Sequence, residues 1–131
     1  MRNIEFTYLY RDGNNFKKWG SVIFSNLEHL PIDAIDKQMR PLLQIDLQFM
    51  AGQVRVPELF LYDDGPFSYD DHCYHEFKAV HLTTEVANDI QNRSIGEFLV
   101  EFARESENGW REFDPYNSEG SLGDFLAARP L

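Results

Sequence analysis

The chain opens with Ile4-Glu5-Phe6-Thr7-Tyr8-Leu9-Tyr10, in which every second residue is Ile, Phe or Tyr. This period of two is typical of a β-strand that buries one face. A turn-forming stretch, Arg-Asp-Gly-Asn-Asn, follows at residues 11–15, and apolar residues return at residues 16–25. The segment therefore predicts an N-terminal β-hairpin. Because apolar residues occupy both parities of residues 19–24, we expect the second strand to lie inside the sheet with both faces covered.

Two helices are expected farther along the chain. After Pro31, a residue suited to a first helical position, apolar residues recur at helical spacing until Pro41 ends or kinks the helix near residue 40. Residues 94–97, Ser-Ile-Gly-Glu, form a capping box and predict a helix over residues 95–107. Its apolar stripe consists of Ile95, Phe98, Leu99 and Phe102.

These elements and a further strand expected over residues 74–82 indicate the α+β class. The expected architecture is a mainly antiparallel sheet with an N-terminal β-hairpin and two helices packed on one face. A chain of 131 residues suits one domain, which we place at residues 1–114. Residues 115–131 form a C-terminal tail, in which residues 121–126 are a candidate short docking helix.

Negative charge is concentrated in the second half of the chain. Residues 1–57 carry seven Lys or Arg and six Asp or Glu, whereas residues 58–131 carry five and sixteen, so that the net charge is −10. Such a field repels nucleic acid and anionic membranes and attracts basic proteins. No apolar run is long enough to span a membrane, and no signal peptide is evident, so we expect a cytoplasmic protein. The single cysteine, Cys73, agrees with a reducing compartment.

The main functional hypothesis is a small acidic intracellular protein-interaction module. Glu97, Glu101 and Glu105 follow one another at i+4 spacing and predict an acidic ridge on the outer face of the second helix. The partner would be a basic protein, as for an inhibitor, immunity protein or antitoxin. The binding residues expected from this pattern are Asp70, Asp71, Glu97, Glu101 and Glu105, with Tyr69 and Trp110 as aromatic anchors.

The alternative hypothesis is a metal-dependent hydrolase built on residues 63–76. That stretch gathers Asp63, Asp64, Asp70, Asp71, His72, Cys73, His75 and Glu76. Its spacing matches neither a zinc motif nor a calcium loop, so no metal, cofactor or catalytic residue is assigned and a non-enzyme is favoured. If residues 74–82 form a regular strand, His75 and His81 share one face about 20 Å apart, too far for direct cooperation.

Overall fold

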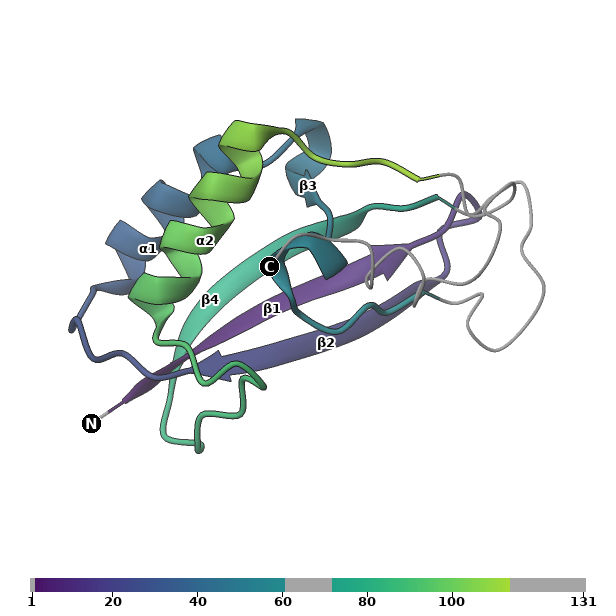
Figure 1. Ribbon diagram of the computed structural model, residues 1–131. Coiled ribbons are helices and arrows are strands. Elements are labelled where there is room, and N and C mark those ends of the chain that lie inside the picture. The colour runs from purple at the N-terminus through teal and green to yellow at the C-terminus, as the bar shows by residue number, and fades with distance from the viewer. Residues whose placement is uncertain (1, 61–71, 114–131) are drawn as a thin grey trace.

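The computed structural model describes residues 2–60 and 72–113, which form an antiparallel sheet with helices on one face (Figure 1). The strand order is β2-β1-β4-β3. In chain order the main elements are β1 (Asn3–Arg11), β2 (Lys17–Phe24), α1 (Ile32–Met39), β3 (Gln48–Phe49), β4 (His75–Thr83) and α2 (Ile95–Asn108). Short 3-10 helices occur at η1 (Arg40–Leu42), η2 (Ile45–Leu47) and η3 (Gly52–Val54). The α+β class and its architecture are confirmed.

The N-terminal hairpin forms as predicted. β1 pairs with β2 from Ile4 opposite Phe24 to Arg11 opposite Lys17. Asp12 organises the turn, because its side-chain oxygen accepts hydrogen bonds from the backbone amides of Asn14 and Phe16, both at 2.9 Å. A short acid at this position thus satisfies backbone donors that the strands leave unpaired.

The predicted interior position of the second strand is wrong, since β2 lies at the edge of the sheet. Val22 and Phe24 face the helices and are buried, whereas Trp19 faces the opposite side and is 52% exposed. Ile23 also points away from the helices but is buried because the loop around Asn88 packs along this edge. A covering loop therefore explains the apolar residues at both parities, without a further strand.

A bulge in β4 changes which side chains share a face. Thr7 lies opposite Ala79 and Tyr8 opposite Phe77, so Lys78 has no opposing residue in β1. The extra residue reverses the alternation, so that His75 is fully buried and His81 is exposed on the other side. The prediction that these two histidines share a face is therefore wrong.

Both helices have the predicted limits to within a residue or two. α1 ends at Met39 and continues into η1, which contains Pro41, while Pro31 precedes the helix as its N-cap. The capping box of α2 is present: the Ser94 hydroxyl accepts from the Glu97 amide, and the Glu97 carboxylate accepts from the Ser94 amide. The predicted stripe of α2 is buried.

The core lies between the sheet and the helices and is rich in aromatic rings. Phe6, in the middle of β1, has the ring centroids of four other aromatic residues 5.2–5.8 Å from its own. These four residues are Tyr8, Phe49, Phe77 and Phe98. Because they belong to β1, β3, β4 and α2, one cluster ties the layers together.

Candidate functional site

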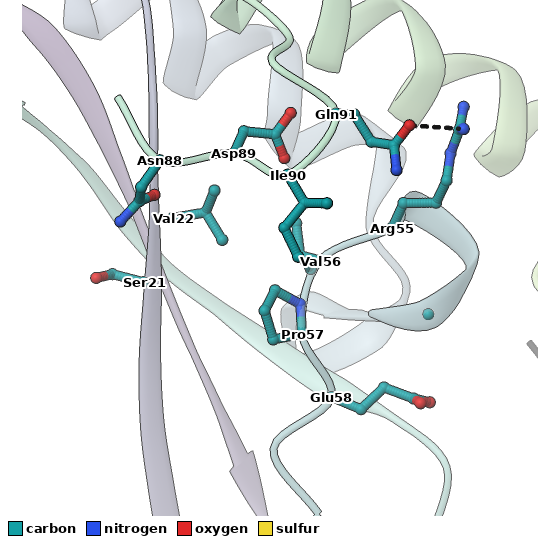
Figure 2. Close-up of a pocket in the computed structure, with 11 residues that line it drawn as sticks. Ser21, Val22, Arg55, Val56, Pro57, Glu58, Asn88, Asp89, Ile90 and Gln91 are labelled. Carbon is teal, nitrogen blue, oxygen red and sulfur yellow. Dashed lines mark hydrogen bonds between the residues drawn. The ribbon is translucent and has the colours of Figure 1, made fainter. Parts of the chain in front are cut away.

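A pocket of about 550 Å³ lies beside the edge strand β2, between residues 52–58 and the loop at residues 88–91 (Figure 2). Its apolar wall is made by Val22, Val56, Pro57 and Ile90. Polar groups surround this wall, so the pocket has an apolar interior and a polar rim. This combination is typical of a site that takes up an apolar group from a larger ligand.

Asn88 fixes the loop that forms one side of the pocket. Its side-chain oxygen accepts from the backbone amide of Ile23 at 2.8 Å, and the backbone amide of Asn88 donates to the Ile23 carbonyl at 2.9 Å. Asn88 therefore occupies the place that a residue of a neighbouring strand would take. This attachment holds Ile90 at the pocket, where its side chain is 86% exposed.

The opposite wall is held by the segment after η3. Arg55 adopts a left-handed conformation with φ 61°, and the Val56 amide returns to the Ala51 carbonyl. The Tyr8 hydroxyl donates to the Pro57 carbonyl at 2.5 Å. Burial raises the pKa of Tyr8 far above its ordinary value, and the nearby charge of Glu58 adds to this, so the hydroxyl remains a donor. The wall is thus anchored to the centre of β1.

A network of ion pairs lies beside the pocket, between the loop at residues 88–91 and the segment after η3. Arg93 is buried beside the stacked rings of Phe24 and Phe98 and donates to both oxygens of Asp89 at 2.9 Å. It also donates to the carbonyl oxygens of Val54 and Arg55. One buried guanidinium therefore joins the loop to the segment after η3.

The electrostatics of this network keep Asp89 ionised. Burial alone would raise the pKa of Asp89, but hydrogen bonds and the charge of Arg93 outweigh burial and hold the pKa below its ordinary value. Glu101 of α2 completes the network, accepting from Arg93 at 3.2 Å and from Arg55 at 2.7 Å. The four charges balance, and the rim beside Arg55 is held firmly.

The three glutamates predicted to form an acidic ridge on α2 have different surroundings in the structure, and their predicted role in binding stays a prediction. Glu101 is only 9% exposed and lies between two arginines. Glu97 is used by the capping box, and Glu105 pairs with Arg111 at 3.3 Å. The i+4 spacing does place the three carboxylates along one side of the helix, but Glu101 and Glu105 pair with arginines, and only Glu97 is exposed.

The other predicted binding residues are not brought together with the pocket. Trp110 is half-buried, and its ring packs against Phe102 with centroids 5.3 Å apart. Tyr69, Asp70 and Asp71 lie outside the described residues, as does the candidate docking helix of the tail at residues 115–131. Their predicted role in binding stays a prediction.

The described part of the 63–76 cluster does not converge on a metal. His72 uses Nδ1 to accept from the Tyr74 amide, Glu76 pairs with Arg11, and Cys73 is buried. His75 accepts from the Leu59 amide at 2.8 Å within the core. No group of three or more His, Cys, Asp or Glu side chains within residues 2–60 and 72–113 is arranged to hold a metal ion. Asp63 and Asp64 fall outside those ranges.

The residues that line the pocket were not predicted from the sequence. Ile90 and Val86 are isolated apolar residues in a polar stretch, and both are highly exposed, at 86% and 83%. Apolar residues in a polar loop can mark an interaction site, and this was the signal available in the sequence. Val22 and Val56 carried none, because they are more than 60 and more than 30 residues away from the loop that meets them and look like ordinary core residues.

Among the helices that the structure describes, none has the length and apolar character needed to cross a membrane. Comparison with protein families, with curated proteins and with solved structures found no match to this chain.

Proposed function

We propose that this protein is a polypeptide-binding module whose site is the pocket beside β2 and whose partner is a basic protein. The observation that carries the proposal is the exposed Ile90 side chain beside the apolar wall of Val56 and Pro57, next to the edge strand β2. An apolar side chain of the partner would fill the pocket and remove this surface from water. Burial of one such side chain contributes about 1.5–3 kcal/mol, enough for an anchor but not for a whole interface.

Charge supplies the long-range attraction in this proposal. The net charge of −10 would speed the approach of a basic partner and make association sensitive to salt. A protein that binds and inhibits a basic enzyme, in the manner of an immunity protein or antitoxin, fits both features. A cytoplasmic setting belongs to the same proposal, because the single cysteine, Cys73, is buried and not in a disulfide.

The test compares two exposed residues of the same loop. Ile90→Asp places a charge at the pocket, whereas Val86→Asp makes the same chemical change at a residue that does not line it. Tagged wild type and both variants are used to recover partners from the native cell, and the recovered protein is then purified and its affinity measured directly at several salt concentrations.

We expect Ile90→Asp to weaken binding of the purified partner about tenfold to a hundredfold, and Val86→Asp to leave it within about twofold. The partner should be basic, and its association rate should fall as salt rises. Equal recovery and equal affinity for all three proteins would show that the pocket is not the binding site. A partner without net positive charge would remove the electrostatic part of the proposal.

A further inference from the structure

The outer edge of β2 has two parts, which differ in whether their backbone groups are hydrogen-bonded. At Ile23 both backbone groups point outward and are bonded to Asn88. In an antiparallel ladder, residues with outward groups alternate with residues that bond to the neighbouring strand. Lys17, Trp19 and Ser21 therefore also point their amides and carbonyls outward. Among the residues that the structure describes, no hydrogen bond reaches the outward groups of Trp19 or Ser21.

Large apolar side chains are exposed along this unpaired part. Trp19 is 52% exposed on the face away from the helices, with the Lys78 ammonium 6.0 Å from its ring centroid. Phe16, at the end of the hairpin turn, is 67% exposed. An open edge with apolar neighbours is a template for another strand, and proteins usually cover or protect it.

We propose that β2 pairs with β2 of a second copy of this chain, antiparallel and about a twofold axis at Trp19. The two sheets then become one continuous sheet, and Phe16 of each copy lies at the pocket of the other. The inference goes beyond the proposed function, although it uses the same pocket, so that self-association and partner binding would compete.

Hydrogen-bond geometry and charge select this register. Outward residues must oppose outward residues, so the axis passes through a residue and not between two. An axis at Lys17 or Lys18 sets that lysine against its own copy, which is unfavourable. An axis at Gly20 or Ser21 sets Lys17 or Trp19 opposite Ile23, whose backbone groups already bond to Asn88. The axis at Trp19 sets Lys17 opposite Ser21 and Lys18 opposite Gly20. In this register the outward backbone groups of Lys17, Trp19 and Ser21 can all form hydrogen bonds with the second copy.

The same register brings complementary groups together at the pocket. Continued by one residue, it sets Phe16 opposite Val22, whose side chain forms part of the apolar wall. Lys18 comes opposite Gly20, against which Leu59 packs, and the adjacent residue is the acidic Glu58 of the pocket rim. The exposed ring of one copy thus meets an apolar pocket, and its lysine meets an acidic residue of the pocket rim.

Sedimentation velocity over a range of concentrations tests self-association with the full chain. Ser21→Pro removes an outward amide while leaving the bonds to β1 in place, and Ser21→Thr is its control. Phe16→Asp tests the pocket contact independently, with Ile45→Asp as control because Ile45 is also a highly exposed apolar residue, at 84%, on the segment before β3. We expect a reversible dimer whose dissociation constant rises about tenfold or more in Ser21→Pro and Phe16→Asp and changes less than about twofold in both controls.

Cysteine cross-linking tests the register. In a Cys73→Ala background, Trp19→Cys places two thiols across the axis at a Cα separation of about 5.5 Å, within the range of a disulfide. Lys18→Cys places its thiols out of register, so oxidation should link the first variant rapidly and the second poorly. Equal cross-linking of the two would overturn the register.

Wild type that remains monomeric at about 1 mM would overturn the proposal, as would a dimer that neither Ser21→Pro nor Phe16→Asp weakens. These results would leave the proposed function intact, because that depends on loss of partner affinity in Ile90→Asp. Conversely, a dimer with the predicted register and no effect of Ile90→Asp on any partner would support the self-association alone.

Discussion

Arg93 and Glu101 form an ion pair inside the protein, with Nη1 and Oε2 3.2 Å apart and side chains only 8% and 11% exposed. The second carboxylate oxygen of Glu101 accepts from Arg55 at 2.7 Å. One side chain of α2 therefore holds two arginines that flank the pocket. The network explains why a helix can keep a glutamate at this position without repelling its neighbours.

Replacing Glu101 should destabilise the fold. In Glu101→Gln the side chain keeps its size, but Arg55 loses the carboxylate with which it pairs and Arg93 keeps only Asp89. Breaking a buried pair in this way should lower the free energy of unfolding by about 2–4 kcal/mol, measured by urea denaturation. Glu107→Gln, an exposed change on the same helix, should cost less than about 0.5 kcal/mol. Equal costs would mean that the network contributes little to stability.

Glu28 and Gly96 are expected to be coupled at the start of α2. The Glu28 carboxylate accepts from the Ser94 hydroxyl at 2.6 Å and from the Gly96 amide at 3.2 Å. A Cβ at position 96 would lie 2.4 Å from the Glu28 carboxyl carbon. Gly96→Ala should therefore displace Glu28 and lose these bonds, which offsets the usual gain of about 0.5–1 kcal/mol from replacing a helical glycine.

A double-mutant cycle measures this coupling. In a Glu28→Ala background the obstruction is absent, so Gly96→Ala should raise the free energy of unfolding by about 0.5–1 kcal/mol, whereas in wild type it should lower it or leave it unchanged. The same effect of Gly96→Ala in both backgrounds would show that the two residues are independent.

His75 should make stability depend on pH in acid. Burial, with a smaller contribution from the charge of His72, lowers the pKa of His75 from 6.5 to about 3. Between these values the unfolded chain binds a proton at this position and the folded protein does not, so stability falls as the pH falls. From pH 7 to pH 5 this group alone should remove about 2 kcal/mol from the free energy of unfolding.

The check is the slope of stability against pH in His75→Gln. Whatever its stability at pH 7, this variant should lose about 2 kcal/mol less than wild type between pH 7 and pH 5. His81→Gln is the matched control, because that histidine is exposed on the other side of β4 and the variant should follow wild type. Parallel curves for wild type and His75→Gln would contradict the assignment.

Removal of divalent metal should leave the fold unchanged. In the described residues 72–76, Nε2 of His75 accepts from the Leu59 amide and the Glu76 carboxylate pairs with Arg11, and no group of three His, Cys, Asp or Glu side chains among the described residues is arranged to hold an ion. Excess chelator should therefore leave the melting temperature of the native protein unaltered. A fall of several degrees would restore the hydrolase hypothesis, since a bound ion stabilises the folded state by mass action.

The hairpin and α2 could be predicted because they depend on short-range sequence patterns. The capping box joins Ser94 and Glu97, three residues apart, and the alternation of β1 repeats every two residues. Interactions over such short separations depend on backbone geometry that the sequence itself specifies. The same holds for the end of α1 near Pro41, where a missing amide and the ring stop the helix.

Long-range packing decided the features that sequence reasoning missed. Asn88 reaches Ile23 across 65 residues, and Arg55 reaches Glu101 across 46. The first contact turns an apparently central strand into a covered edge, and the second neutralises Glu101, one of the three glutamates of the predicted ridge. The bulge at Lys78 likewise arises from pairing with β1, and no glycine or turn-forming residue marks its position in the sequence.

By itself, then, the sequence determined the N-terminal hairpin, the two helices, the buried stripe of α2, the α+β class and the strong negative charge, because these follow from periods of two to four residues and from composition. Only the tertiary structure decided that β2 is an edge, that Glu101 is neutralised and that Val22, Val56 and Ile90 share a pocket. The physical reason is that burial and charge pairing depend on which distant segment arrives at a surface, and no local period records that.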